Sequence, residues 1–371
     1  MPSIEKVEAG FMSYEPAVQW PDRDGPQIAT IVRIRTAGGI EGVSVTWNDS
    51  PASSLLASTV HAWFAERLAG CDVRLHPAST EALFKQAAWN GVSCVALAAM
   101  DNALWDAKAK AYGLPLHAVL GSRHEKLPIY AGSRAELGMS SFEAVADHVA
   151  EAREAGYAAY KLHLWGGAER DIAGCEFIRN RFGDDQRLMF DPLGRYSPGE
   201  SLQVARVLER LGFEWFEDPL PAEQRNAYRW LAQRVDIPLV AADSLQWSWN
   251  DYLEAATTHT PIMLRLDAGR QGITFTSEMI AIANAHGVRC EIHAFGPEAN
   301  SVAGLHTALA QKPLSYYEGC FPRRSFEIPG IEVPTHHDRD GHVAAPDAPG
   351  LGLDCDWTYL DARTTWVGRP Y

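Results

Sequence analysis

The chain has 371 residues, of which 46% are apolar and 22% charged, and these are the proportions of an ordinary globular protein. A net charge of −14 argues against a nucleic-acid groove or an anionic membrane surface as its partner. No run of 18 apolar residues is present, and the N-terminus has no basic-then-apolar signal pattern. Six scattered cysteines without a CxxC pair are typical of a reducing compartment. We therefore expect a cytoplasmic protein that binds neither nucleic acid nor membrane.

Residues 1–125 are predicted to form a small α+β unit. Two runs of β-branched residues, 28–35 and 40–47, flank a Gly-Gly pair and predict a β-hairpin. The polar and aromatic segment 11–25 before them is predicted to be a mobile loop. Apolar residues recur at helical spacing in the stretches that follow, and Gly113 supplies a stop signal after the last of them. The predicted helices are 55–69, 80–89 and 93–111.

Residues 126–320 alternate regularly between short apolar runs and amphipathic stretches. Eight strand-like runs with helices between them indicate a parallel sheet, and this number favours a closed barrel over an open one. Residues 321–371 are rich in Pro and Gly and are predicted to pack back on the first unit. The predicted strands are 127–131, 158–163, 187–191, 213–217, 237–242, 262–267, 288–293 and 315–318. The predicted helices lie near 141–155, 168–182, 198–211, 224–234, 247–257, 271–286 and 299–311.

Most of these strands end at an ionisable residue. The C-terminal ends of barrel strands surround one mouth, where active sites lie, so side chains far apart in sequence are expected to converge there. The residues concerned are Lys161, His163, Asp191, Glu217, Asp243, Asp267, His293 and Glu318.

Three of these residues, Asp191, Glu217 and Asp243, are carboxylates on consecutive strands, spaced 26 and 26 residues apart. Three acids at one mouth repel each other unless a cation neutralises them. A hard divalent ion such as Mg²⁺ does so with oxygen ligands and keeps positions open for a substrate. The alternative is that they are unrelated acids, each capping a helix or pairing with an arginine.

The remaining strand-end residues fit acid–base chemistry. Lys161 and His163 lie two apart on one strand and point to the same side, so they are expected to give an anionic substrate a cation and a base. Asp267 and His293 end adjacent strands, where the carboxylate could orient the imidazole and raise its basicity. Glu318 could donate to a substrate carboxylate if its pKa is raised. Each also has a structural alternative: a surface lysine, a packed histidine, a structural His–Asp pair or a capping acid.

The ordered set of these motifs resembles the mandelate racemase subgroup of the enolase superfamily. Residues 96–121 (ALAAMDNALWDAKAKAYGLPLHAVLG) resemble its last cap-domain helix and the lead-in to its barrel. The segments KLH at 161–163, FEDPLP at 216–221 and LDAGRQGIT at 266–274 resemble its strand-end motifs, and His293 lies where the family keeps a dyad histidine.

The resemblance implies a modified (β/α)7β TIM-like barrel with an N-terminal α+β capping domain, a homo-oligomer and one Mg²⁺ per subunit. It also implies abstraction of the proton α to a carboxylate through a metal-stabilised enediolate. On this resemblance the metal ligands are Asp191, Glu217 and Asp243, while Lys161 with His163 and His293 with Asp267 lie on opposite faces of the substrate and Glu318 contacts its carboxylate.

The sequence departs from the family in ways that affect the substrate. Asp243 is shorter than the usual glutamate. Leu193 lies where some relatives keep an Asn or a His, which removes a possible third-strand base and argues against the dehydratases that use one there. The first-ranked activity is a lyase reaction, dehydration of an aldonate or aldarate to a 2-keto-3-deoxy acid. The alternatives are a racemase or epimerase of a 2-hydroxy acid, a sugar-acid lactone cycloisomerase and, more remotely, a non-catalytic metal-dependent binder. Further substrate contacts are expected from Trp20, Arg195, Trp247 and Arg270.

Overall fold

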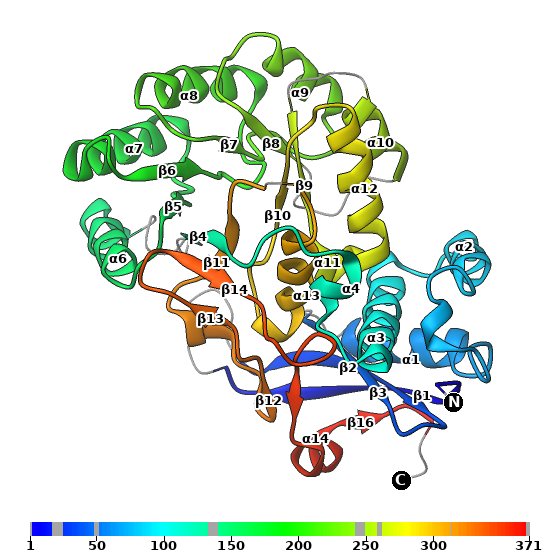
Figure 1. Cartoon of the computed structure of the whole chain (residues 1–371). Coiled ribbons are helices and arrows are strands. Elements are labelled where there is room, and N and C mark those ends of the chain that lie inside the picture. The colour runs from blue at the N-terminus through cyan, green and yellow to red at the C-terminus, as the bar shows by residue number, and fades with distance from the viewer. Residues whose placement is uncertain are drawn as a thin grey trace.

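The computed structural model describes residues 2–16, 25–47, 52–132, 140–241, 249–257, 262–312 and 314–368. A smaller N-terminal unit lies against one side of a barrel, and the C-terminal segment runs back to that unit (Figure 1). Within the described parts of the chain, no helix is long and apolar enough to cross a membrane.

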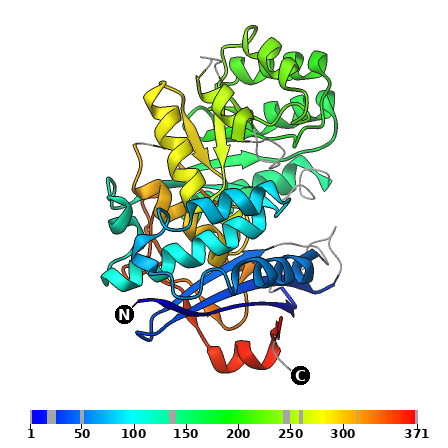
Figure 2. The same ribbon diagram turned by 90° about the vertical axis from the view of Figure 1, so that its right-hand side faces the viewer.

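The N-terminal unit is an antiparallel sheet with helices on one face (Figure 2). Its strands are β1 (Ile4–Tyr14), β2 (Gln27–Thr36) and β3 (Glu41–Trp47), and its helical elements are α1 (Ala52–Phe64), η1 (Val73–Leu75), α2 (Glu81–Trp89), α3 (Cys94–Tyr112) and α4 (Leu116–Leu120). The loop predicted for 11–25 is wrong in its first part, because residues 11–14 continue β1 and pair with residues 27–30 of β2. Cross-strand pairing and the burial of Met12 and Tyr14 stabilise this end of β1. Residues 17–24 lie outside the described residues.

Helix α3 lies between the N-terminal sheet and the barrel. The Ser93 hydroxyl accepts a hydrogen bond from the Ala96 amide at its start, and Gly113 ends it in the left-handed region at φ 68°. The helix approaches β3 so closely that a Cβ on Gly42 would meet the Ala103 carbonyl oxygen at 2.3 Å. The Asp106 carboxylate accepts hydrogen bonds from the backbone amides of Val43 and Leu351, each at 2.7 Å. One buried acid therefore links this helix to both the sheet and the C-terminal segment.

The central part is a closed barrel of eight parallel strands, as predicted. Strands β4 to β11 pair in chain order, and β11 pairs with β4 to close the sheet. The strands are β4 (Leu127–Gly132), β5 (Ala159–Leu162), β6 (Arg187–Phe190), β7 (Phe216–Glu217), β8 (Leu239–Ala241), β9 (Ile262–Leu266), β10 (Cys290–Ile292) and β11 (Tyr317–Cys320). The helices are α6 (Phe142–Glu154), α7 (Ala168–Phe182), α8 (Pro198–Arg210), α9 (Arg225–Ala232), α10 (Trp249–Thr257), α11 (Ala268–Gln271), α12 (Ile273–Ala285) and α13 (Glu298–Leu309).

The barrel interior changes from apolar to charged along its strands. A buried apolar cluster fills it first, and it includes Tyr130, Met189, Trp215, Met263 and Tyr316. Inward-pointing residues are two apart along a strand, so the next inward position after four of these residues is an ionisable one. The pairs are Met189 with Asp191, Trp215 with Glu217, Met263 with Arg265, and Tyr316 with Glu318. The apolar layer therefore supports a charged layer nearer the mouth.

Glu291 on β10 is a buried acid beside this apolar layer. Its oxygens accept from the backbone amides of Ser315 and Tyr316 at 3.2 and 3.4 Å, and burial raises its pKa to about 7. A raised pKa means that the folded chain holds this proton more tightly than the unfolded chain does. The associated stability is complete below the unfolded pKa near 4.5 and is lost as the pH rises through about 7.

We therefore expect the effect of Glu291→Gln on stability to be more favourable at pH 8 than at pH 4.5. Relative to the wild type, the free energy of unfolding of the variant should gain about 3 kcal/mol between these two pH values. Urea unfolding of both proteins at each pH measures this difference. If the free energy of unfolding differs between the variant and the wild type by the same amount at both pH values, Glu291 does not titrate in this range.

The C-terminal segment contacts both the barrel and the N-terminal unit. Its strand β14 (His342–Ala344) pairs antiparallel with β4 of the barrel, and β16 (Thr365–Trp366) pairs antiparallel with β1. The Arg33 guanidinium of β2 lies 3.6 Å from the centre of the Trp357 ring. The other elements are η2 (Arg323–Phe326), β12 (Ile331–Glu332), β13 (His336–His337), β15 (Asp354–Cys355) and α14 (Trp357–Arg363). The division of the chain at residues 125 and 320 stays a prediction.

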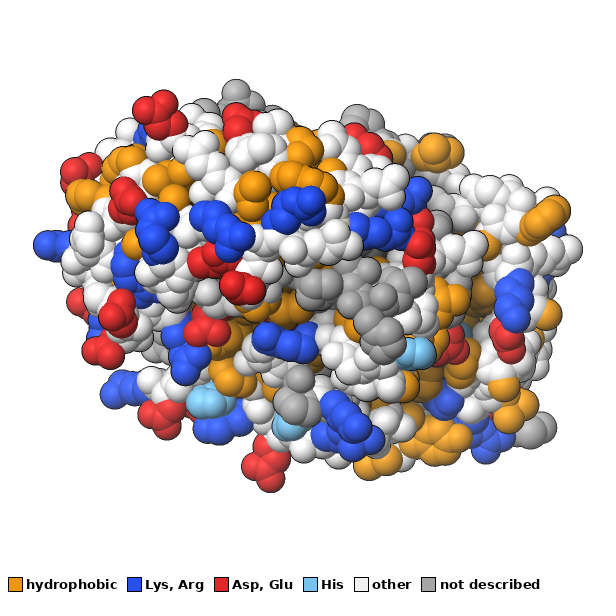
Figure 3. All heavy atoms as spheres, turned by 90° about the horizontal axis from the view of Figure 1, so that it is seen from above, with side chains coloured by type: hydrophobic (Ala, Val, Ile, Leu, Met, Phe, Trp, Pro, Cys, Tyr) orange, Lys and Arg blue, Asp and Glu red, His pale blue; other side chains and the backbone are white. Residues whose placement is uncertain are grey.

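Figure 3 shows one face of the molecule with all heavy atoms drawn as spheres. On the part of this face that the structure describes, basic side chains are interspersed with acidic ones, and apolar side chains form small groups between them. This mixture is typical of a solvated surface.

Candidate active site

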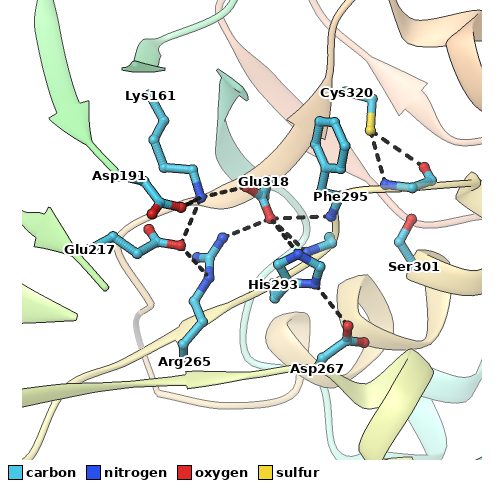
Figure 4. A network of polar contacts seen from close by, with 12 residues as sticks. Lys161, Asp191, Glu217, Arg265, Asp267, His293, Phe295, Ser301, Glu318 and Cys320 are labelled. Carbon is cyan, nitrogen blue, oxygen red and sulfur yellow. Dashed lines mark hydrogen bonds and ion pairs between the residues drawn. The ribbon is translucent and has the colours of Figure 1, made fainter. Parts of the chain in front are cut away.

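Lys161 lies at the centre of the charged layer, on β5. Its Nζ is 2.8 Å from Glu217 Oε1, 2.9 Å from Glu318 Oε1 and 3.6 Å from Asp191 Oδ2 (Figure 4). Burial disfavours the charged form, but the carboxylates of Glu217 and Glu318 outweigh it and hold the Lys161 pKa well above its ordinary value. Lys161 is therefore held in its charged form by these two carboxylates.

The predicted ligand Asp191 follows β6, and the predicted ligand Glu217 ends the adjacent strand β7. Both side chains are fully buried. Burial raises the Glu217 pKa more than Arg265 and Lys161 lower it. Burial also acts on Asp191, but a hydrogen bond from His163 and the charge of Lys161 bring its pKa below the ordinary value. His163 Nε2 lies 3.2 Å from Asp191 Oδ2, and the Trp215 indole donates to Glu217 Oε2 at 2.9 Å.

These carboxylates fit a hard divalent cation. Asp191, Glu217 and Glu318 lie together with two permanent cations, Lys161 and Arg265, so acidic groups are in excess. Carboxylate oxygens are the donors that Mg²⁺ prefers. Among the residues that the structure describes, no three His, Cys, Asp or Glu side chains form a complete metal-binding group. The third predicted ligand, Asp243, lies outside the described residues.

The predicted His–Asp pair is formed. His293 follows β10, and its Nδ1 lies 2.8 Å from Asp267 Oδ2. Burial favours the neutral acid, but the Arg270 guanidinium and the His293 hydrogen bond hold the Asp267 pKa well below its ordinary value. An ionised Asp267 accepts the Nδ1 proton, which leaves Nε2 as the nitrogen that can take up a proton. This Nε2 is 3.9 Å from Glu318 Oε2, on the other side of Glu318 from Lys161 (Figure 4).

Arg270 lies against this pair. Asp267 is the N-cap of α11 and accepts the Arg270 amide at 3.1 Å, so the start of the helix turns the arginine back toward it. The guanidinium contacts the Asp267 carboxylate, and its Nη2 is 2.5 Å from His293 Nδ1 and 3.0 Å from Nε2. We predicted Arg270 as a substrate contact, and the structure places it on the dyad.

Glu318 is held as an ionised acceptor. Its Oε2 accepts the amides of Ala294 and Phe295 at 2.9 and 3.2 Å and lies 2.7 Å from Arg265 Nη2. Burial alone raises its pKa, but Arg265 and Lys161 lower it well below the ordinary value. Two cations stabilise the charged form of Glu318 in this structure, which opposes the raised pKa that donation to a substrate carboxylate needs. That role of Glu318 stays a prediction.

Arg265 and Tyr130 belong to the charged layer, but the sequence did not lead us to expect them there. The Arg265 side chain is fully buried, with Nε 3.1 Å from Glu217 Oε1, and its Nη2 donates to the Tyr130 hydroxyl at 2.6 Å. Strand alternation offers a signal for it, because a residue two positions before Asp267 on β9 points to the same side. Arg265 thus joins a proposed metal ligand to Glu318.

Helix α3 of the N-terminal unit fixes the turn that carries Asp267. The Asn102 amide donates to the Ala268 carbonyl at 2.8 Å and accepts the Ile273 amide at 3.0 Å, so it links the start of α11 to the start of α12. Beside it, Asp101 accepts the backbone amide of Thr274 at 2.9 Å. The N-terminal unit therefore helps to position the dyad.

Of the other expected substrate contacts, only Arg195 lies in the described part of the chain. It is exposed in the loop after β6, with its guanidinium 4.4 Å from the centre of the Trp165 ring. Trp20 and Trp247 lie outside the described residues.

Two family models match the chain. The model for the N-terminal domain of mandelate racemase and muconate lactonizing enzyme covers residues 23–121, and the enolase C-terminal domain-like model covers residues 144–359. The chain belongs to the mandelate racemase and muconate lactonizing enzyme family. The predicted membership of the enolase superfamily and the predicted barrel with an α+β capping domain are thereby confirmed.

Members of this family with curated names resemble the chain at low identity. The D-galactarolactone cycloisomerase of Agrobacterium fabrum is 28% identical over 71% of this chain and 72% of its own. A D-mannonate dehydratase of Caulobacter sp. is 26% identical over 88% of each chain. A crystal structure of D-glucarate dehydratase from Agrobacterium tumefaciens, complexed with magnesium, superposes with a TM-score of 0.81 at 26% identity, covering 98% of this chain and 99% of that one. These family members are enzymes, which supports an enzymatic role for this chain.

Proposed function

We propose that this protein catalyses Mg²⁺-dependent removal of the proton α to the carboxylate of an acid sugar, with dehydration to a 2-keto-3-deoxy acid as the first-ranked outcome. The observation that carries the proposal is the arrangement around Glu318 in Figure 4. A charged lysine lies on one side and a carboxylate-oriented histidine on the other, next to two buried carboxylates that follow adjacent strands.

A cation is needed because an α-proton of a carboxylate is too weakly acidic for a side chain to remove unless the developing charge is stabilised. Mg²⁺ bound by Asp191, Glu217 and Asp243 would supply that stabilisation, and the magnesium-bound relative supports this metal. Lys161 supplies a second positive charge for the substrate carboxylate. Its ion pairs with Glu217 and Glu318 hold the ammonium group in place before substrate arrives.

His293 is the proposed base on one face of the substrate. With Nδ1–H donated to Asp267, the Nε2 lone pair points away from the dyad and can take the α-proton. Arg270 Nη2 lies against both ring nitrogens of His293 in this structure, nearer to Nδ1 than to Nε2, so the guanidinium has to move away before His293 can act. His163 lies beside Asp191 and is the proposed acid or base of the opposite face, next to Lys161.

Two reactions share this first step. In dehydration, the C–H bond at the α-carbon and the C–O bond at the β-carbon break, and a protonated histidine gives its proton to the departing hydroxyl to form water. The enol that remains tautomerises to the 2-keto-3-deoxy acid. In cycloisomerisation the leaving oxygen is part of the lactone ring, so the ring opens and no water is released. The names of the curated relatives include both reaction types, and cycloisomerase is the second candidate.

Proton NMR of a panel of acid sugars with the protein and Mg²⁺ in D₂O distinguishes these outcomes. Loss of the α-proton signal with a 2-keto-3-deoxy product supports dehydration, and ring opening of a lactone supports cycloisomerisation. An inverted centre alone indicates an epimerase or racemase. Mg²⁺ binding with every aldonate, aldarate and lactone inert would contradict the proposal and favour a binder. The homo-oligomeric state and the cytoplasmic location stay predictions.

A further inference from the structure

Arg195 is an arginine at the barrel mouth whose guanidinium has no acidic hydrogen-bonding partner among the residues that the structure describes. It lies in the loop between β6 and α8, four residues after the proposed ligand Asp191, and it is exposed. Within the described ranges, its guanidinium stacks on Trp165 but forms no hydrogen bond or ion pair. A guanidinium carries five N–H donors in a planar fork, so Arg195 presents a charged donor surface next to the site.

Trp165, which supports this arginine, has a strained backbone. It follows β5 with φ at 54°, a left-handed conformation that costs free energy in a residue other than glycine. The turn places the indole ring against both neighbours, 6.3 Å from the His163 ring and 4.4 Å from the Arg195 guanidinium. Its Nε1 is buried and has no acceptor in the described part of the chain. Strain of this kind is found where a side chain has to be aimed at a ligand.

A buried acid fixes the two loops to each other. Asp171 on α7 accepts the Gly166 amide at 2.8 Å with one oxygen and the Tyr196 hydroxyl at 2.5 Å with the other. Gly166 is the neighbour of Trp165, and Tyr196 is the neighbour of Arg195. The stacked pair is therefore held by the fold, unlike an arginine that only rests on the surface.

We infer that Arg195, held on Trp165, binds the distal carboxylate of a dicarboxylic acid sugar, which means an aldarate or its monolactone. This inference rests on the proposed function, in which Lys161 and the metal site take the first carboxylate. A planar guanidinium matches a carboxylate with two parallel charge-assisted hydrogen bonds, whereas the terminal hydroxyl of an aldonate offers neither the charge nor the second acceptor.

The charges agree with this assignment. The Trp165 ring lies edge-on to the ring of His163, a proposed acid–base residue, and carries the Arg195 guanidinium on its face, so the arginine is placed next to the site. The other arginine that we expected to contact substrate, Arg270, is paired with Asp267 in this structure and lies on the dyad side of the mouth. Arg195 is thus a cation on this side of the mouth that can take a second anionic group.

The test compares matched acids with and without the second carboxylate. We would measure kcat/KM with Mg²⁺ for D-glucarate against D-gluconate and for galactarate against D-galactonate, in the wild type and in Arg195→Gln. We expect the wild type to prefer the dicarboxylates, and the variant to lower the dicarboxylate-to-monocarboxylate ratio by 10- to 100-fold, mainly through KM. Arg195→Lys should recover part of the ratio, because it keeps the charge but loses the planar fork.

Arg234→Gln is the matched control. Its guanidinium also stacks on a tryptophan, Trp230, at 4.6 Å, but it follows α9 at the end of the barrel away from the mouth. This control should leave the ratio unchanged. A ratio that Arg195→Gln leaves unaltered, or a wild type that uses only monocarboxylates, would overturn the inference while the proposed reaction stands.

Binding measurements separate the inference from the reaction. If the wild type transforms no acid sugar, the proposed function fails, and calorimetric titration of the Mg²⁺-loaded protein with D-glucarate and D-gluconate decides the inference alone. Binding that favours the dicarboxylate in the wild type, and loses this preference in Arg195→Gln, supports it. Equal affinities in the two proteins, or no binding, overturn it.

Discussion

His293→Asn is expected to lower kcat for the best acid sugar by about 1,000-fold, within the range that general bases contribute. Asparagine fills a similar volume and can still hydrogen-bond to Asp267, but it cannot take up a proton at neutral pH. Mg²⁺ affinity should change little, because His293 is not among the proposed ligands. Steady-state kinetics and calorimetric Mg²⁺ titration of the variant measure the two effects separately.

His286→Asn is the control for that variant. His286 is exposed at the C-terminal end of α12, away from the mouth, and its replacement should leave kcat within about twofold. If His293→Asn retains most of the wild-type kcat, the dyad is a structural pair and the base lies elsewhere, with His163 as the next candidate.

Asp191→Asn is expected to weaken Mg²⁺ binding by at least about 100-fold and to reduce turnover at low Mg²⁺ in parallel. The variant replaces an ionised oxygen, which is held in that form by His163 and Lys161, with a neutral amide oxygen. Because Mg²⁺ strongly prefers charged oxygen ligands, part of the lost turnover should return at high Mg²⁺ concentration. Calorimetric titration with Mg²⁺ alone gives the affinity without any assumption about substrate.

The exposed acid Asp185, in the turn before β6, provides the comparison variant. Asp185→Asn removes the same charge from the protein but should leave Mg²⁺ affinity unchanged. Equal Mg²⁺ affinity in Asp191→Asn and the wild type would remove Asp191 from the proposed ligand set.

Much of the barrel could be predicted because its signal is local. Each strand is a short apolar run followed by an amphipathic helix, and the eight predicted runs overlap β4 to β11. The strand ends then indicated which ionisable residues meet at the mouth, and the dyad of Asp267 and His293 has the geometry that adjacent strands predict. The sequence also carried enough motifs for the family resemblance that the family models confirm.

The sequence could not predict in the same way which groups the charged side chains of the site contact. Whether Arg270 meets a substrate or the dyad depends on how the first turn of α11 directs its side chain, and the Asp267 cap decides that. The ionisation of Glu318 depends on Arg265, which points inward from β9 and meets Tyr130 from a strand 135 residues away. The end of strand β1 was not predicted for a related reason. Its pairing with β2 and the burial of its side chains outweigh the polar, aromatic composition of this segment.

The central claim is that a divalent cation at Asp191 and Glu217 makes an α-proton of an acid sugar removable by a side chain of this protein. The most direct test is exchange of that proton with D₂O, followed by proton NMR, in protein treated with EDTA and dialysed and in the same protein after Mg²⁺ is added back. The account predicts exchange only with Mg²⁺ present, and loss of that exchange in His293→Asn. Exchange that continues at the same rate without a divalent metal would contradict it.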